Sequence, residues 1–200
     1  MCSLTRSRRI KKAKQMIRKI CVYCGSGQGT NPVFTQAAHA FGAEMAKHKV
    51  GLVYGGGNLG LMGTIARSVL EHGGHVTGII PQFLKTKEQM LEGAQELIIT
   101  NTMHERKMLM FEKSDAFVAL PGGIGTLEEL VEQMTWAQLQ QHSKPVIIAN
   151  IARFWDPLLA LIGHMKEYGF IRQGCEVAPL VTDTVDDIIP LLRQAILVEP

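Results

Sequence analysis

Short apolar runs alternate along the chain with segments whose apolar residues recur at helical spacing. The runs are rich in β-branched residues, as strands are, and they read KICVYCGS, VGLVYGGG, HVTGIIP, ELIIT, DAFVALPGG and PVIIAN. The helical patterns fall between and after them, at 33–48, 60–72, 103–113, 125–141, 156–167 and 184–197. Such alternation is typical of βαβ units with right-handed crossovers, which place helices on both faces of a sheet. The predicted fold class is therefore α/β, with a doubly wound parallel sheet.

The chain of 200 residues predicts a single domain at 20–200, because it contains no internal repeat, low-complexity stretch or Pro/Ser-rich linker. Eight of the 21 Lys and Arg residues lie in 1–19, which contains no acid. We interpret 1–19 as a basic N-terminal extension, either a solvated, disordered arm or a transit-type segment. The rest of the chain has more acidic than basic residues, which argues against binding of nucleic acid. No apolar run approaches the ~18 residues of a membrane-spanning helix, so we expect no membrane partner.

Two of the four cysteines, Cys21 and Cys24, have the spacing of a redox or zinc pair. No second pair completes a zinc site, and the two residues lie inside an apolar strand-like run. We interpret them as reduced thiols packed on a strand of a cytoplasmic protein. No metal site is predicted.

Three predicted strands end in glycine-rich turns, which read CGSGQG, YGGGNLGLMG and LPGGIGT. Ligands of doubly wound sheets bind beyond the carboxyl ends of the strands, where these turns should meet. Glycines let backbone N–H groups approach a ligand, and a helix start that follows adds unpaired donors and partial positive charge. The three turns together predict a site for a phosphate.

The second turn also matches the dinucleotide fingerprint, with glycines at 55, 57 and 60. That fingerprint needs an acidic residue about 20 positions further on to hold a ribose, but the next strand ends in GIIPQF, which has none. No Gly-Lys-Ser/Thr follows any of the turns, so the phosphate loop of the nucleoside triphosphatases is missing too. The NAD(P) interpretation is therefore weakened without being excluded.

The helix that follows the third turn carries glutamates at 128, 129 and 132. On a helical wheel Leu127 and Val131 share an apolar stripe that should pack on the sheet. Glu129 lies roughly opposite, in line with Gln133 and Trp136. Solvated acids at a helix start would explain the glutamates. They would not explain the tryptophan, which indicates a surface covered by a ligand or a partner subunit.

The segment MHERKMLMFEKS predicts a helix that is apolar on most sides and hence largely buried, with Arg106 among its methionines. A buried guanidinium needs an anion or dense hydrogen bonding. That anion could be a structural carboxylate, a ligand phosphate or an active-site glutamate, and the spacing does not choose between them.

A phosphate cradle, a carboxylate and an anchored arginine suit a phosphorylated substrate that develops positive charge. Cleavage of an N-glycosidic bond fits, because its transition state resembles an oxocarbenium ion that a carboxylate stabilises. The same carboxylate could orient or deprotonate the attacking water. Arg106 is a poor proton donor at neutral pH and is better suited to positioning.

The motifs PGGIGTLEE at 121–129 and MHERK at 103–107 resemble the paired signature of the Lonely Guy family, the cytokinin riboside 5′-monophosphate phosphoribohydrolases once mislabelled lysine decarboxylases. The similarity covers about 20–190. It implies a Rossmann-like homodimer that hydrolyses a nucleoside 5′-monophosphate to free base and ribose 5-phosphate, with its active site near the interface and with no cofactor, neither PLP nor NAD.

The resemblance also implies the site residues. The catalytic pair carries over to Arg106 and Glu129. The residues implied to bind substrate or phosphate are Gly25, Ser26, Gly56, Gly57, Glu88, Lys107, Pro121, Gly122, Gly123, Ile124, Gly125, Thr126, Leu127, Glu128 and Thr135. Position 124 departs from the family, where many members have tyrosine, and the basic extension is a second departure.

Family membership leaves the base open. Cytokinin nucleotides such as isopentenyladenosine monophosphate, or AMP itself, could be the main substrate. A module that binds a nucleotide without turnover is a further alternative.

Overall fold

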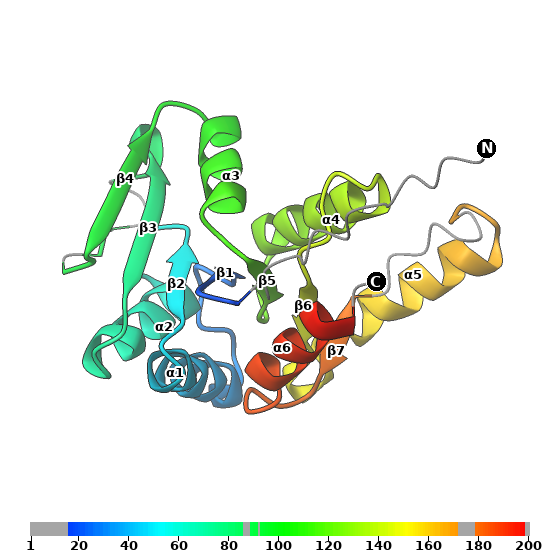
Figure 1. The fold of residues 1–200 in the computed structure, drawn as a ribbon, viewed down its shortest axis with the longest axis horizontal. Helices are drawn as coiled ribbons and strands as arrows, with labels where there is room; N and C mark the ends of the chain where they lie inside the picture. Colours follow the sequence, from blue (N-terminus) through cyan, green and yellow to red (C-terminus); the bar gives the residue numbers. More distant parts are fainter. Residues whose placement is uncertain (1–15, 86–88, 92, 172–178, 199–200) are drawn as a thin grey trace, which may run out of the picture.

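The computed structural model describes residues 16–85, 89–91, 93–171 and 179–198. Its strands are β1 Lys19–Tyr23, β2 Gly51–Tyr54, β3 Val76–Pro81, β4 Glu96–Thr100, β5 Ala116–Ala119, β6 Val146–Ala149 and β7 Leu180–Thr182. Its α-helices are α1 Pro32–Lys47, α2 Gly60–Glu71, α3 Met103–Glu112, α4 Ile124–Gln138, α5 Asp156–Glu167 and α6 Ile188–Val198 (Figure 1). Two short 3-10 turns, η1 Gln82–Leu84 and η2 Ile151–Arg153, complete the described elements.

The strands form one parallel sheet in the order β4-β3-β2-β1-β5-β6-β7. β1 pairs in parallel with both β2 and β5, so the strand order reverses at the β1–β5 boundary. In an open α/β sheet this switch point leaves a crevice outside the carboxyl ends of the strands. The sheet therefore confirms the predicted α/β class and places the first and third glycine turns on either side of the crevice.

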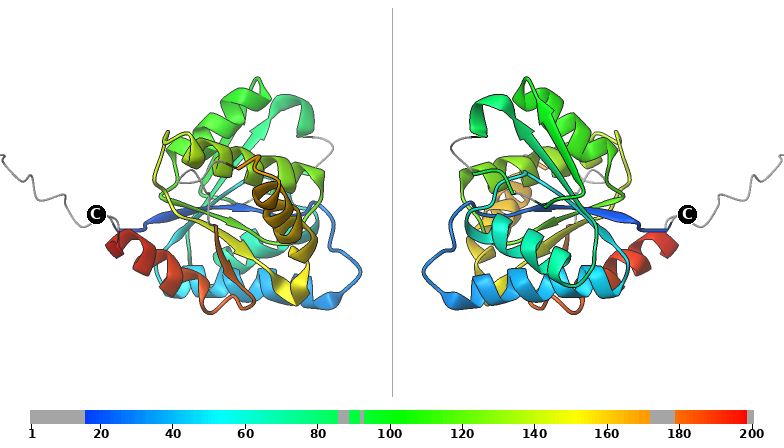
Figure 2. Two further views of the ribbon diagram at one scale, coloured as in Figure 1. Left: turned by 90° about the vertical axis from the view of Figure 1, so that its right-hand side faces the viewer. Right: turned by 90° about the vertical axis from the view of Figure 1, so that its left-hand side faces the viewer.

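Helices cover both faces of the sheet, and each face has its own core. Alternate residues of β1 point to opposite faces, as Val22 and Cys21 do. One core packs against α1, α2 and α6, and the other against α3, α4 and α5. Figure 2 shows α1 and α6 on one side of the strands and α3 and α4 on the other. The inner strands β3, β2, β1, β5 and β6 are buried on both sides, which is why they read as continuous apolar runs.

The predicted segments match the elements closely, with two differences at the C-terminal end. β7 is only three residues long, shorter than the runs from which the other strands were recognised. The last helix begins at Ile188 rather than at 184. Thr184 instead donates its hydroxyl to Asp187 and its backbone N–H to Thr182, and such local side-chain bonds favour a turn over a helix.

The boundary of the basic extension falls at the sheet. Lys19, its last residue, is the first residue of β1. The backbone N–H groups of Arg18 and Lys19 donate to the Asp115 carboxylate at 2.8 and 3.0 Å. Residues 1–15 lie outside the described residues, so the interpretation of the extension stays a prediction.

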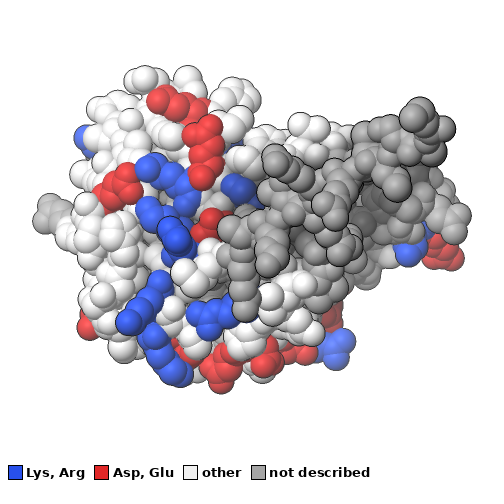
Figure 3. Space-filling model, in the orientation of Figure 1, with Lys and Arg blue, Asp and Glu red and all other residues white. Residues whose placement is uncertain are grey.

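Charged side chains of both signs share the surface. Figure 3 shows basic side chains running down the middle of one face with acidic ones beside them. Lys19 and Lys113 both pair with Glu96, at 3.7 and 2.8 Å. Within the described ranges, we find no helix with both the length and the apolar character needed to cross a membrane.

Candidate active site

The three glycine turns meet at the carboxyl ends of β1, β2 and β5. The N–H of Gly25 donates to Pro121 O at 3.1 Å, and the N–H of Leu61 donates to Gly25 O at 3.0 Å. Backbone hydrogen bonds thus join the first turn to the other two. Gly60, at φ +57°, packs so closely on Ser26 that a Cβ would overlap its backbone. The predicted meeting of the turns is therefore observed.

A pocket of about 200 Å³ opens between these turns and the starts of α2 and α4. Eight residues from the predicted site line it, namely Gly25, Ser26, Arg106, Gly123, Ile124, Gly125, Thr126 and Glu129. They come from three separate stretches of the sequence, which the fold brings to one place.

Arg106 and Glu129 face each other in this pocket. Arg106 Nη1 lies 3.6 Å from Glu129 Oε1, and the two side chains are 8% and 12% exposed. The guanidinium also donates from Nε to Ile79 O at 3.1 Å and from Nη2 to Gly55 O at 3.4 Å. A Cβ at position 55 would overlap the guanidinium, so any other residue there would displace Arg106 from this position. Arg106 is thus anchored by the backbone of β3 and the second turn, with its third nitrogen facing the glutamate.

The start of α4 offers donors to a ligand. Gly123 is its N-cap, and no side chain hydrogen-bonds to this helix start in the described structure. The first N–H groups of a helix have no partner within it and lie at the positive end of its dipole. Glu129 lies less than two turns further along the same helix. An anion at the helix start and a positive centre near the carboxylate would both be stabilised.

A second ionic contact flanks the first. Lys107 Nζ lies 2.7 Å from Glu128 Oε1 and 2.8 Å from Glu132 Oε1, so α3 and α4 are joined by two adjacent sets of charged side chains. Burial opposes the charge of Lys107, but the hydrogen bonds to both glutamates outweigh it and raise its pKa. Neither Lys107 nor Glu128 lines the pocket of Arg106 and Glu129.

The helical wheel predicted the wrong buried face for α4. Val131, expected to pack on the sheet, is 42% exposed. Gln133, expected on the open face beside Glu129, is almost fully buried, and Trp136 packs edge-to-face on Phe111 at 5.3 Å. The wheel assumed that only the sheet covers α4. Because α3 lies alongside and contacts it, the buried face is rotated toward Glu129.

The expected deep burial of α3 is also wrong. Only Arg106 and Met110 of this helix are buried, and Met108 is 45% exposed. α3 packs with one face on the sheet and the side of α4, and its other side is open. The apolar residues on that side therefore remain available for another surface.

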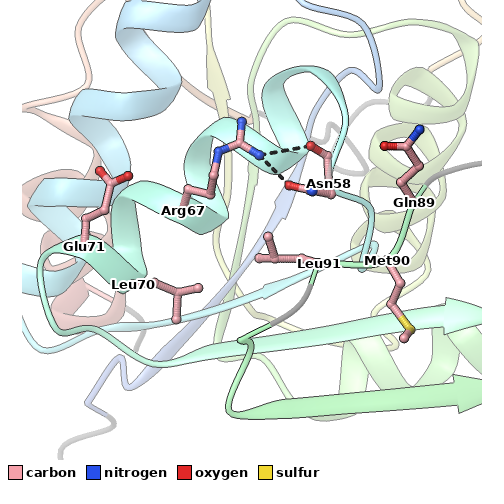
Figure 4. A pocket seen from close by; sticks show the side chains of 7 residues that line it. All are labelled: Asn58, Arg67, Leu70, Glu71, Gln89, Met90 and Leu91. Carbon is pink, nitrogen blue, oxygen red and sulfur yellow. Dashed lines mark hydrogen bonds between the residues drawn. The ribbon is translucent and has the colours of Figure 1, made fainter.

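The turn with Gly56 and Gly57 is held from behind. The N–H of Asn58 donates to Gln89 O at 2.9 Å, and Gly57 forms an antiparallel bridge with Met90. Figure 4 shows Arg67 of α2 reaching Asn58, whose carbonyl oxygen it contacts at 3.1 Å. The hollow of about 470 Å³ around these residues is larger than the pocket of Arg106 but contains neither Arg106 nor Glu129. We interpret the residues that line this hollow as a structural support for the turn.

Thr135 and Leu127 belong to the predicted site but do not line the pocket of Arg106 and Glu129. Thr135 is exposed and donates its hydroxyl to Val131 O at 2.8 Å, and Leu127 packs against the core under α4. Glu88 lies outside the described residues. Their roles in binding stay predictions.

The cysteines at 21 and 24 are free and buried. Burial raises the pKa of both thiols, which disfavours the reactive thiolate. The predicted packing is confirmed, although Cys24 comes directly after the last residue of β1, and the compartment stays a prediction. Among the described residues no group of three or more His, Cys, Asp or Glu side chains could hold a metal ion.

Comparison with known sequences decides the family. The family model described as "Possible lysine decarboxylase" matches residues 62–192. A "probable cytokinin riboside 5′-monophosphate phosphoribohydrolase" of Oryza sativa subsp. japonica is 44% identical over 88% of this chain and 79% of that protein. A cytokinin riboside 5′-monophosphate phosphoribohydrolase of Arabidopsis thaliana is 40% identical over 92% of this chain and 87% of that protein. This chain belongs to the phosphoribohydrolase family.

Solved structures with the same fold include molybdenum cofactor proteins. The molybdenum cofactor binding protein of Rippkaea orientalis superposes with a TM-score of 0.67 at 22% identity, covering 90% of this chain and 97% of that one. The molybdenum cofactor carrier protein of Chlamydomonas reinhardtii gives 0.67 at 20% identity, covering 90% and 98%. At these identities the likeness concerns the fold alone.

Two pocket residues of this phosphoribohydrolase family member were not predicted. Met62 lines the pocket from the first turn of α2, and Cys24 lines it from the end of β1. The segment GLMG after the second turn could have indicated Met62, because a helix that starts at the site also directs its first turn there. Nothing in the sequence indicated that Cys24 lines the pocket, because it lies in an apolar run that predicts a strand.

Proposed function

We propose that this protein hydrolyses the N-glycosidic bond of nucleoside 5′-monophosphates, releasing the free base and ribose 5-phosphate. The observation that carries the proposal is the nearly buried Arg106–Glu129 pair, 3.6 Å apart, beside the uncapped start of α4. The relatives in the family, whose names specify this reaction, support it.

The 5′ phosphate binds at the start of α4 in this proposal. The N–H groups of the residues from Gly123 to Thr126 receive it, with Gly25 and Ser26 opposite. Backbone donors at a helix start suit a phosphate, and they need no cation. An unphosphorylated nucleoside would lack this anchor.

Glu129 and Arg106 then act on the ribose. As the C1′–N bond breaks, positive charge develops on the sugar, and the Glu129 carboxylate stabilises it. Glu129 also orients and deprotonates the attacking water, whose oxygen bonds to C1′ while the base departs with the electron pair of the broken bond. The proton taken from water balances the one the base gains on release. Arg106 holds the carboxylate and ribose oxygens in place and transfers no proton.

Cytokinin nucleotides are the proposed substrates, because the relatives carry that substrate in their names. AMP has the same phosphate, ribose and purine and differs only in lacking the apolar group on N6. The residues that contact phosphate and ribose therefore treat the two alike, and any preference must come from the surroundings of the base.

A substrate panel tests the function. The full chain is incubated with isopentenyladenosine 5′-monophosphate, AMP and the two matching nucleosides, and free base is measured by chromatography. We expect base from the monophosphates and none from the nucleosides, with a higher kcat/KM for the isopentenylated nucleotide. Faster release from AMP would make this an AMP nucleosidase. Tight binding of both nucleotides without release of base would overturn the proposal in favour of a binding module.

We further propose a homodimer whose interface lies beside the site. Ile124, Val131 and Leu139 lie along one face of α4 and are 81%, 42% and 62% exposed. Met108 on α3 is exposed as well. Apolar stripes of this kind on a helix are typical of interfaces. Ile124 also lines the pocket, so a partner subunit on this face would lie against the opening of the site.

The cytoplasm is the proposed compartment. The free, buried thiols of Cys21 and Cys24 support it, because reduced cysteines persist in reducing compartments.

A further inference from the structure

An aromatic crevice adjoins the pocket of Arg106 and Glu129. One wall is formed by the rings of Phe34 and Phe154, which pack edge-to-face with centroids 5.6 Å apart. Its floor is the backbone of the turns after β1 and β5, at 25–29 and 121–123, and its volume is about 300 Å³. It lies outside the carboxyl ends of β1 and β5, at the switch point of the sheet, where α/β proteins bind ligands.

The crevice and the pocket share one boundary. Gly25, Ser26 and Gly123 line both, whereas Arg106 and Glu129 line the pocket only. A ligand that extends from Glu129 past these shared residues therefore meets the phosphate cradle first and the crevice second. A group in the crevice lies on the far side of the 5′ phosphate from the glycosidic bond.

The position of Phe154 is fixed by an unusual backbone. Ala152 and Arg153 precede it with φ values of 50° and 60°, a left-handed conformation that non-glycine residues seldom adopt. The side chain of Asn150 holds the segment, accepting from the N–H of Trp155 at 2.8 Å and donating to Asp156 at 2.8 Å. Such strain persists where the surroundings enforce it, and it clusters at ligand sites.

The chemistry of the crevice selects an uncharged ring. None of the described residues that line it is charged. Phe154 is 37% exposed, so part of its ring is open to contact. Glycine backbone on the floor lets a flat group lie close, and aromatic faces bind other rings by stacking.

We propose that the aromatic crevice is a second subsite of the nucleotide site, which takes an uncharged aromatic ring esterified to the 5′ phosphate. This rests on the proposed function, from which it takes the position of the phosphate. The protein thus binds 5′-phosphate diesters of adenosine that carry an aryl group, in addition to AMP.

Binding calorimetry tests the subsite. AMP and its phenyl ester, adenosine 5′-phenylphosphate, are titrated into full-length Glu129→Gln, where turnover does not interfere. Adding Phe154→Ala should weaken binding of the ester by about tenfold, the loss of one stacking contact, and change AMP affinity by less than about twofold. Phe170→Ala is the matched control, because Phe170 is 83% exposed and does not line the crevice. It should change neither affinity.

A second variant fills the crevice instead of opening it. A Cβ at Gly27 would meet no atom within 4 Å, so Gly27→Leu should fold, exclude the ester and retain AMP. The proposal would be overturned if either variant weakened the binding of AMP and of the ester equally. It would also be overturned if neither Phe154→Ala nor Gly27→Leu changed the affinity for the ester, or if the ester failed to bind where AMP does. If the wild-type protein releases no base from either AMP or isopentenyladenosine 5′-monophosphate, the proposed function fails, yet these binding measurements still decide the subsite.

Discussion

Arg106 and Glu129 are 23 positions apart in the sequence, and they reach the same pocket from two helices. The backbone carbonyls of Ile79 and Gly55 fix the guanidinium there. A nearly buried ion pair is an uncertain source of stability, because desolvation offsets attraction. It does hold two side chains in a defined geometry. We therefore propose a chemical role for the pair, and substitution can separate that role from its contribution to stability.

Glu129→Gln should lower kcat for base release by about 10²- to 10⁴-fold. The amide has nearly the same shape as the carboxylate, but it neither stabilises a cationic sugar nor accepts a proton from water. Steady-state kinetics with a nucleoside monophosphate measure the loss, and a thermal melt checks the fold. An unchanged kcat would remove Glu129 from the mechanism.

Arg106→Ala should lower the free energy of unfolding by about 3 kcal/mol, because Glu129 would remain charged in a site with little access to water. Urea denaturation at pH 7 measures this. In the double variant Arg106→Ala/Glu129→Ala the loss should be smaller than the two single losses together, since neither charge is then left alone. Strict additivity would contradict an energetic coupling of the pair.

For single residues, the sequence indicated which residue types take part in the proposed chemistry, but it did not indicate the contacts that position them. Glycine turns, a glutamate and an arginine were visible as residue types at suggestive positions. The Arg106 contacts to Ile79 and Gly55 were not, because they depend on how β2, β3 and α3 come together. Nothing in the sequence indicated that Phe154 lies near the site, because only the fold brings its ring against that of Phe34.

α3 and α4 are linked mainly by charged side chains. Lys107 contacts Glu128 and Glu132 on successive turns of α4, immediately beside the Arg106–Glu129 pair. Any change in the spacing of the two helices would alter the catalytic geometry. Lys107 can therefore act on the reaction without touching the substrate.

Lys107→Met should lower kcat by at least about tenfold with little change in KM, because small displacements of catalytic groups are costly. Lys107→Arg should recover part of the rate. Lys113→Met is the matched control, since Lys113 also pairs with a glutamate, Glu96, but away from α4. An effect on KM alone would instead support direct contact between Lys107 and the nucleotide, the role implied by the resemblance.

The existence and order of the elements were predictable, whereas the orientation of α4 was not. Periodicity locates a helix because burial of one stripe repeats along it. It does not reveal that a second helix covers the adjoining side, which is why Gln133 is buried and Val131 exposed. The same limitation made α3 look more buried than it is.

For the molecule as a whole, the exposed stripe of α4 predicts self-association. Val131→Lys should convert a dimer to a monomer and reduce activity, because a lysine at the centre of an apolar interface must lose its hydration. Light scattering after size exclusion measures the mass. Val181→Lys on β7 is the control, with the same residue type and the same 42% exposure. A wild-type monomer with full activity would contradict the dimer.

The global architecture was the most predictable feature. A parallel sheet with helices on both faces follows from the six apolar runs that alternate with helical patterns, because the inner strands of such a sheet are covered on two sides. β7 was missed because three residues carry too little pattern. Residues such as Met62 come near the site from distant segments. Their positions depend on the geometry of the crossovers, which no local sequence pattern encodes.

The cysteines in and just after β1 offer a way to watch this architecture open. Cys21 is fully buried in the core under α3, α4 and α5, so a thiol-labelling reagent can reach it only when that helical layer lifts from the sheet. Cys24 follows β1 and lines the pocket of Arg106 and Glu129, so a reagent can approach it from the pocket. In a variant with Cys2 and Cys175 changed to serine, the two labelling rates would report separately on opening of that layer and on access to the pocket. A nucleotide bound in the pocket should then slow labelling at position 24 more than at position 21.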